Sequence, residues 1–175
     1  CIVWWTGINP SVIVPVQGDG DEARLTIYIR NGGTSNASIR SIRELLPPAF
    51  EYDGDLQSIN LVDNNNGAFN LGSPSVSGPQ WSYTGPDIIN SCSPRSSTQA
   101  SNQQRLEWNW GNASTAPRVQ PGTTAQISFD IELEGTALPG NYADMPWVET
   151  VPHECASGLN AGRPATVSIF YTAIV

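Results

Sequence analysis

Lysine is absent from this 175-residue sequence, and all eight of its basic residues are arginines. The absence excludes sites whose chemistry needs an amine side chain: Schiff-base formation, a lysine-containing phosphate loop, and lysine–asparagine cross-links. Histidine occurs once, as His153, beside Glu154 and Cys155. A single histidine leaves no zinc-ligand set, and neighbours in an extended segment point to opposite faces, which disfavours a Cys–His catalytic pair. We therefore expect the chain not to be an enzyme and to carry no cofactor, with calcium left open.

Charged residues are also scarce, at 14% of the sequence, and sixteen acidic residues against eight basic ones give a formal net charge of −8. Scattered arginines on an acidic chain offer no cationic stripe for a phosphate backbone, which excludes nucleic acid as a partner. The same charge disfavours anionic membrane surfaces, and no run of about twenty apolar residues could insert into a membrane. If the chain is exported, we expect the sequence to be a mature form or a trimmed ectodomain.

Cysteine occurs three times. Cys92 and Cys155 lie in polar, turn-rich stretches where free thiols would be open to oxidation, so we predict a disulfide between them and an extracellular location. The bond would close a loop of about sixty residues and stabilise the fold by about 4 kcal/mol. Cys1 is left over. Its alternatives are a bridge to one of the others, an intermolecular bond, a lipid-bearing N-terminus or a free thiol.

Helical periodicity is nearly absent, and only residues 41–46 could form a short helix or turn. Elsewhere, short β-rich segments are bounded by turn residues, with sixteen glycines and fourteen prolines in the chain. Residues 24–30 and 126–133 alternate apolar with polar side chains, which is typical of strands with one buried face. Ile39 and Ile42 lie three apart within 37–45, which predicts a bulge or bend there. The other predicted strands are 11–16, 58–62, 105–110, 142–148 and 165–175.

A polar stretch interrupts this pattern at residues 64–104, which are rich in Asn, Ser, Gly, Pro and Gln. Because so long a connection is unusual in a compact domain, we interpret it as an insertion with one or two hairpins around Trp81. Residues 1–9 form an apolar N-terminal extension, and the whole of 1–175 is interpreted as a single domain. Seven to eight strands with these loop lengths predict an all-β, immunoglobulin-like Greek-key sandwich.

The order of the segments also resembles a known family. A Gly18-Asp19 turn leads into LTIYIRNGG, a second strand ends at the corner LLPPAFEYDG, and LEWNWG follows. Pro121-Gly122 then precedes TTAQISFDIEL, and Pro139-Gly140-Asn141-Tyr142 comes last. Over about residues 10–172 this order resembles the immunoglobulin-like repeat domain of bacterial and archaeal surface proteins, known as domain of unknown function eleven. The resemblance implies a spacer, stalk, fibre or adhesive module without shared catalytic residues. The 64–104 segment is longer than the family's equivalent.

Acidic turns offer candidate metal ligands. Hard oxygen atoms that could bind calcium are supplied by Asp19, Asp21 and Glu22, or alternatively by Asp53, Asp55 and Asp63 with the asparagines 64–66, although neither set matches the twelve-residue calcium loop. Asp53 and Asp55 flank Gly54 and could pair as the carboxylates of a glycosidase. Turns also recruit aspartate for its hydrogen bonds to nearby backbone, and that is the ordinary explanation for both groups.

Two kinds of surface site involve sugars. Trp81 and Trp147 are the tryptophans that could stack on a sugar ring or another ligand, with core packing or loop anchoring as the alternative for each. Asn36-Ala37-Ser38 and Asn112-Ala113-Ser114 match the N-glycosylation acceptor pattern, and would make the chain a glycoprotein. Such triplets also arise by chance in a sequence rich in Asn and Ser.

Both ends of the sequence are apolar, reading CIVWWTG at 1–7 and FYTAIV at 170–175. Apolar terminal segments must be covered, either by pairing as edge strands within the molecule or by adding to the open sheet edge of a neighbour. A third possibility is that one end is cut from a longer chain. The residues predicted to mediate assembly are Cys1, Ile2, Val3, Trp4, Trp5, Phe170 and Tyr171.

Together these observations predict a non-enzymatic, extracellular structural or adhesive module of a cell surface, such as a pilus-like filament subunit or a stalk repeat. The expected partners are further copies of the chain or neighbouring surface-protein domains. The alternative is a carbohydrate- or ligand-binding sandwich that uses exposed tryptophans, with a glycan as its partner.

Overall fold

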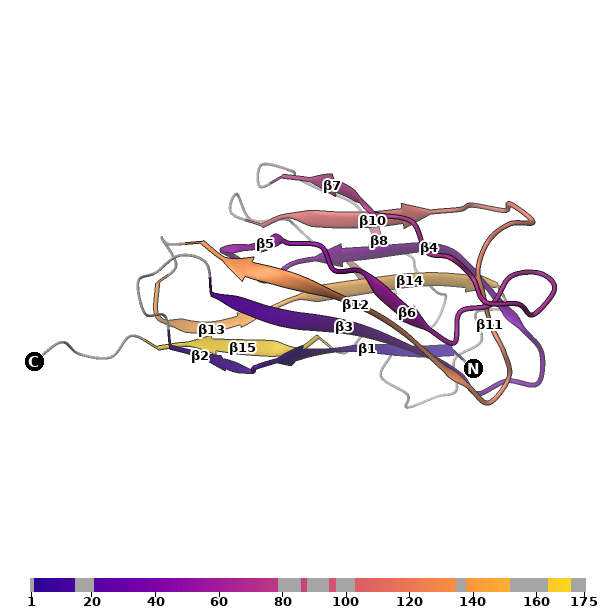
Figure 1. The fold of residues 1–175 in the computed structure, drawn as a ribbon, viewed down its shortest axis with the longest axis horizontal. Coiled ribbons are helices and arrows are strands. Elements are labelled where there is room, and N and C mark those ends of the chain that lie inside the picture. The colour runs from indigo at the N-terminus through magenta and orange to yellow at the C-terminus, as the bar shows by residue number, and fades with distance from the viewer. Residues whose placement is uncertain are drawn as a thin grey trace, which may run out of the picture.

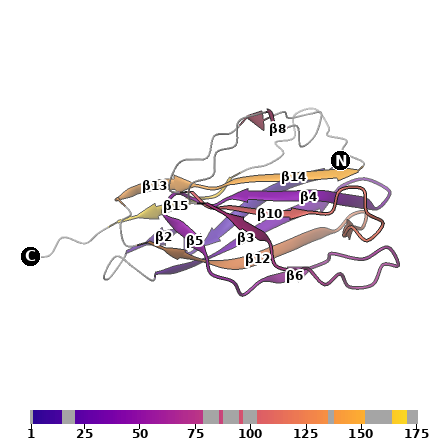
Figure 2. The same ribbon diagram turned by 90° about the horizontal axis from the view of Figure 1, so that it is seen from above.

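The computed structural model describes residues 2–14, 21–78, 86–87, 95–96, 103–134, 138–151 and 164–170. Every regular element within these ranges is a β-strand, and the strands form two layers, seen from two directions in Figures 1 and 2. The all-β prediction is confirmed. A helix of the length and hydropathy required to cross a bilayer does not occur in these ranges.

The first sheet is built on the two most regular strands of the chain. Apolar residues alternate with polar ones along β3 and β12, and their apolar members are buried, as the sequence pattern predicts. Pairing is antiparallel throughout, in the order β1-β3-β12-β5, with β6 also beside β12. The bounds are β1 (Ile2–Asn9), β3 (Glu22–Asn31), β12 (Thr124–Leu133), β5 (Phe50–Tyr52) and β6 (Gln57–Ile59).

The second sheet is centred on β4, which pairs with β14 along one edge and with β10 and β11 along the other. Glu149 lies opposite Ser41 and Thr150 opposite Ile39, so Arg40 is an extra residue in β4, and the predicted bulge is confirmed. The bounds are β4 (Ala37–Leu45), β7 (Ser75–Ser77), β10 (Arg105–Asn109), β11 (Arg118–Val119) and β14 (Met145–Val151).

A third, small sheet joins the two layers at one end of the molecule. It has the order β13-β15-β2, and the remaining pair is β8 with β9. The order β1-β3-β12-β5 is that of the A-B-E-D strands of an immunoglobulin-type sandwich, and β4-β14, with β15 beside β13, corresponds to its C-F-G strands, while β10 is an additional strand beside β4. The bounds are β2 (Val12–Ile13), β8 (Pro86–Asp87), β9 (Arg95–Ser96), β13 (Gly140–Ala143) and β15 (Thr166–Ile169).

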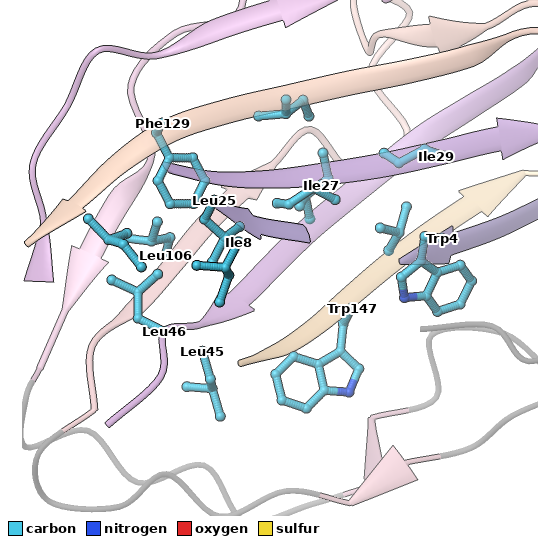
Figure 3. Packing of buried hydrophobic residues seen from close by; sticks show 14 of the residues in the cluster. Trp4, Ile8, Leu25, Ile27, Ile29, Leu45, Leu46, Leu106, Phe129 and Trp147 are labelled. Atoms are coloured by element: carbon cyan, nitrogen blue, oxygen red, sulfur yellow. The ribbon is translucent and has the colours of Figure 1, made fainter. Parts of the chain in front are cut away.

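The hydrophobic core lies between the first and second sheets. Phe129 of β12 is fully buried, and its ring lies 5.4 Å from that of Tyr52 and 6.3 Å from that of Trp108 on β10, measured between ring centroids. Figure 3 shows Phe129 and Ile27 of the first sheet turned toward Leu106 and its neighbours. Burial of this continuous apolar interior is the main favourable contribution to folding.

Several predicted boundaries differ from the structure. The short helix or turn expected at 41–46 is wrong, because residues 41–45 belong to β4 and pair with β10 and β14. The strand expected at 58–62 is Gln57–Ile59, and Val62 makes only isolated bridges. The strand expected at 142–148 is divided between β13 and β14, with Asp144 at the junction. The strands β5, β7 and β11 were not predicted.

Asn31 closes the sandwich at the end where β3 stops. Its buried side-chain amide donates to the carbonyl oxygens of Ser35 and Val119, each at 2.8 Å, and its Oδ1 accepts from the Gly33 amide at 2.9 Å. Its backbone carbonyl accepts from Gly122, whose φ of 73° is the left-handed conformation of the predicted Pro121-Gly122 turn. One side chain thus fixes the strand end, its following turn and β11.

Asn31→Asp is expected to lower the free energy of unfolding by about 2 to 3 kcal/mol, because it removes both amide donors and buries a charge. Asn109→Asp is the matched control. The exposed Asn109 makes the same Oδ1 contact to the amide two residues on, that of Gly111, at 3.1 Å. Urea unfolding curves of the two variants would measure the difference. Equal stabilities would show that the Asn31 amide does not hold the three segments together.

Candidate functional site

The N-terminal strand is covered within its own molecule. Each residue of β1 pairs with β3, from Ile2 opposite Asn31 to Asn9 opposite Arg24. Ile2 and Trp4 are buried in the interior, and the indole Nε1 of Trp4 donates to the Pro146 carbonyl at 3.4 Å. Of the two predicted arrangements for this apolar segment, pairing as an edge strand within the molecule is confirmed for residues 2–9.

The other face of β1 carries two further residues of the predicted assembly set, Val3 and Trp5, both half-buried. The Trp5 ring stacks on Tyr28 of β3, with centroids 5.2 Å apart and an interplanar angle of 8°. Gly7, the next residue on this face, lies beside the Tyr28 ring, and a Cβ there would be in ordinary van der Waals contact with it at 3.4 Å. The apolar side chains of β1 are therefore satisfied on both faces of the strand.

The last described strand, β15, lies directly beside β2. The two run parallel, with the Ser168 amide donating to the Ser11 carbonyl at 2.8 Å and the Phe170 amide to the Ile13 carbonyl at 3.0 Å. On its other edge β15 pairs antiparallel with β13. The Phe170 side chain is 55% exposed. Cys1 and Tyr171, the other predicted assembly residues, lie outside the described residues.

The two strands enter and leave at opposite ends of the molecule. In Figure 1, β1 begins at the right end of the long axis and β15 ends near the left end, beside β2. Because β2 continues the direction of β1 and β15 runs parallel to it, tension applied at Ile2 and Phe170 acts along the strands. The hydrogen bonds of the antiparallel β1–β3 pair are perpendicular to that direction, and those of the parallel β2–β15 pair cross it at a slant.

A buried polar cluster ties the same strands together. Asp144, between β13 and β14, accepts at Oδ1 from the Thr6 hydroxyl of β1 at 2.9 Å and from the Ala165 amide at 2.6 Å. The Ala165 amide also lies 2.9 Å from the Thr6 Oγ1, and Ala165 directly precedes β15. We call Thr6, Asp144, Ala165 and the neighbouring Glu44 the terminal junction, since they join the first sheet, the β13–β14 strand and the start of β15.

Glu44 places a second buried carboxyl group in the terminal junction. It points between the sheets from β4, opposite Leu106 and Pro146, and its side chain contacts that of Asp144. Apart from this contact, neither Glu44 oxygen has a hydrogen-bond donor. Burial, and then repulsion from Asp144, raise the pKa of Glu44 well above its ordinary value. Burial also raises the pKa of Asp144, and its hydrogen bonds, first that from Glu44, oppose the rise.

Several predicted site residues lie outside the described residues. They include both cysteines of the expected disulfide, Cys92 and Cys155, together with Trp81, Asp19 and His153. The disulfide and the Trp81 ligand site therefore stay predictions.

Trp147 does not have the exposure that the ligand-site prediction assumed. It is 2% exposed and belongs to the buried apolar cluster, although strand alternation places it on the opposite face of β14 from Val148, which faces the interior. A sugar ring needs an open indole face to stack on, and Trp147 offers none. The predicted role is corrected to packing.

The acidic turn residues are brought close to other carboxylates. Glu22 is exposed and lies opposite Glu132, which in turn lies opposite Glu51. A hydrogen bond with Asp53, and then repulsion from that carboxylate, raise the pKa of Glu22. Within the part of the chain that the structure describes, no group of three or more His, Cys, Asp or Glu side chains is arranged to hold a metal ion. Asp21 and Glu22, the two members of the predicted calcium site that the structure describes, therefore add no support to that prediction.

The two glycosylation triplets lie at the surface. Asn112 is exposed in the turn after β10, and Asn36 is half-buried, with its amide donating to Asn66 Oδ1 at 3.1 Å. Of the two, Asn112 has the more accessible side chain.

No protein-family model and no curated protein matches the sequence, so the resemblance to the surface-protein repeat rests on the sequence motifs alone. Similar solved structures include a Corynebacterium diphtheriae protein described as membrane-anchored, with 15% identity, TM-score 0.49, and coverage of 96% of this chain and 34% of that one.

Two further similar structures come from bacterial surface proteins. The RrgB pilus protein of Streptococcus pneumoniae has 8% identity and TM-score 0.45, covering 86% of this chain and 23% of that one. A collagen-binding domain of a Staphylococcus aureus adhesin has 10% identity and TM-score 0.42, covering 94% and 96%. The chain thus spans about a third of the C. diphtheriae chain. At these identities and TM-scores the similarities do not bear on what this chain binds or does.

Proposed function

We propose that this chain is a non-enzymatic, extracellular structural module that transmits tension along its long axis, as one bead of a cell-surface stalk or filament. The observation that carries the proposal is the parallel, hydrogen-bonded contact of β2 with β15 between strands that enter and leave at opposite ends (Figure 1). The absence of lysine and the single histidine, which leave few routes to enzyme chemistry, support a mechanical role.

The direction of the strands explains why this arrangement resists extension. When tension acts along a strand, the hydrogen bonds of its ladder are sheared together, since they run across the load and not along it. The β1–β3 ladder spans eight residue pairs, from Ile2 to Asn9, and the β2–β15 contact continues the same line. The terminal junction adds a side-chain link from Thr6 to Asp144.

Burial of β1 also bears on how copies of the chain would associate. Donating β1 to a neighbour would remove Ile2 and Trp4 from the interior, where both are buried, and break the ladder to β3. Full burial of one large apolar side chain is worth about 1.5 to 3 kcal/mol, so the donor-strand mode would first cost this stability. We therefore favour modules that follow one another in series over exchange of β1.

Phe170→Pro tests the β2–β15 contact. Proline has no backbone N–H, so the substitution removes the hydrogen bond from the residue 170 amide to the Ile13 carbonyl, just after β15. Because the Phe170 ring is exposed, its loss does not disturb the core. We expect a lower unfolding force by atomic-force microscopy, with the chain held between two reference domains, and a loss of about 1 kcal/mol in the free energy of unfolding.

Phe170→Ala is the matched control, because it removes the same side chain but keeps the amide. Its unfolding force should equal that of the unaltered protein. If Phe170→Pro and Phe170→Ala unfold at the same force, the contact between β2 and β15 does not bear tension, and the proposal loses its supporting observation.

A further inference from the structure

A pocket of about 210 Å³ opens on the outer face of the second sheet. It lies where β11, the start of β4 and the end of β14 meet, at the right end of the molecule in Figure 1. Ser38, Arg40 and Arg118 line it together with Val151, and Asn112 and Ser114 come from the turn that connects β10 to β11. The pocket is separate from the terminal strands and from the terminal junction.

Strand register explains why these residues meet. Ser38 lies opposite Arg118 on one side and opposite Val151 on the other, so the three side chains form a row across three strands. Arg40 is the bulged residue of β4, and its carbonyl accepts from the amides of Trp110 and Gly111, which starts the turn over the sheet. Arg40 also lies two residues after Ser38, on the same face of the strand, so that both arginines line the pocket.

The pocket concentrates positive charge on an acidic protein. Two of the eight arginines of a chain with a net charge of −8 line it. The Arg118 Nε is buried without a hydrogen-bond acceptor, and Arg118 has no ion pair within the described residues. Arg40 has a long contact to Glu149, 3.7 Å between Nη1 and Oε1. The Arg118 guanidinium therefore has no compensating carboxylate among the described residues.

We propose that this pocket binds the carboxylate of an acidic sugar unit, with Arg118 and Arg40 as the carboxylate-binding residues. Guanidinium groups bind carboxylates through paired, charge-assisted hydrogen bonds, and the two arginines that line the pocket would supply these donors. Ser38, Asn112 and Ser114 provide neutral hydrogen-bonding groups suited to sugar hydroxyls, and Val151 adds an apolar edge. The volume is below the roughly 300 to 1,000 Å³ of drug-sized sites, which suits a single sugar unit.

The test is a titration of isotopically labelled protein with glucuronate, followed by amide chemical shifts. The protein is produced in a host without N-glycosylation so that Asn112 stays unmodified. A dissociation constant on the order of 1 mM is expected for an isolated unit, with shifts grouped around Arg118 and the turn at 111–116. Glucose, acetate and inorganic phosphate are the comparison probes, and each should bind at least about tenfold more weakly.

Two variants separate the contribution of Arg118 from a general charge effect. Arg118→Met should weaken glucuronate binding by about tenfold or more, since a hydrogen bond to a charged group is lost. Arg30→Met makes the same change on the exposed outer face of the first sheet and should leave binding unaltered. Arg118→Lys keeps the charge but lacks the planar guanidinium that binds a carboxylate through two hydrogen bonds, and a loss of affinity is expected here also.

Four results would overturn the proposal. These are an absence of glucuronate shifts near Arg118, equal affinity for acetate, preference for phosphate, and full affinity in Arg118→Lys. Thermal unfolding of each variant, measured alongside, identifies any loss of binding that results from unfolding. Because the pocket lies away from β2 and β15, its failure would leave the mechanical proposal intact.

Discussion

Phe129→Ala is expected to lower the free energy of unfolding by about 3 to 5 kcal/mol, as for other large-to-small changes in well-packed cores. Phe129 is fully buried on the central strand β12 and contacts rings from both sides of the interior, Tyr52 and Trp108. The variant would leave a cavity between the two sheets that neither ring can fill without leaving its present position. Urea unfolding followed by tryptophan fluorescence measures the loss.

The matched control for this substitution is Phe170→Ala. Phe170 is 55% exposed, so the same truncation should change the free energy of unfolding by about 0.5 kcal/mol or less. A loss at Phe129 as small as that at Phe170 would mean that β12 and β10 do not pack as described, and the two-layer arrangement would have to be revised.

The second large effect concerns pH. Stability is expected to decrease as the pH rises above about 4, where free glutamate and aspartate lose their protons. The raised pKa values of Glu44 and Asp144 mean that the folded protein retains protons that the unfolded chain has released. The unfolded state then binds fewer protons, so the free energy of unfolding falls with pH, by up to about 1.4 kcal/mol per pH unit for each proton.

Glu44→Gln should remove much of this dependence. Glutamine is neutral at every pH and can donate from its amide to the Asp144 oxygen that has no partner of its own, Oδ2. At about pH 8 the variant should be more stable than the unaltered protein by about 2 kcal/mol or more, because no second carboxylate is buried beside Asp144. Near pH 4, where the pair holds its protons, the two proteins should differ little.

Glu132→Gln serves as the control for the loss of one negative charge, since Glu132 lies on the outer face of the first sheet. It should change the slope of stability against pH only slightly, because the Glu132 charge is the smallest contribution to the raised pKa of the exposed Glu22. Urea midpoints measured from about pH 4 to pH 8 for the three proteins provide the comparison. A Glu44→Gln variant with the same slope as the unaltered protein would exclude Glu44 as the source of the pH dependence.

The strands that the sequence predicted best are those with strict alternation. Residues 24–30 and 126–133 lie within β3 and β12. Where apolar and polar side chains alternate strictly, only one face of the strand can point toward the core, so both the strand and its orientation can be predicted. Short strands such as β5 and β11 could not be found in this way, since two or three residues carry no measurable period. Their place is set by pairing with β12 and β4.

The terminal junction was not predicted, for a different physical reason at each residue. Thr6 shares the buried face of β1 with Trp4 and Ile8. A polar residue between two apolar ones on that face could have indicated a buried hydrogen bond. Glu44 lies two residues after Ile42, so the predicted bulge at Arg40 places it on the buried face, and this signal was also available; which groups it contacts there depends on tertiary packing. Asp144 lies between two strands, and only tertiary contacts bring it to Thr6.

Trp147 shows the limit of inference from residue type. A tryptophan in a polar surrounding suggests an exposed ring, yet the side chain is buried on the outer side of its sheet. Which parts of the chain cover a sheet face depends on the packing of connections, and no local pattern encodes it.

The central claim, that the sandwich transmits tension along its terminal strands, depends on direction, and force measurements in two directions test it most directly. With the protein held at residues 2 and 170, tension acts along the strands, and the β1–β3 and β2–β15 bonds are sheared together. With the protein held at residues 3 and 51, on β1 and β5, tension acts across the first sheet and opens one bond after another. The account predicts a higher unfolding force along the strands than across them. An equal or lower force along the strands would contradict it.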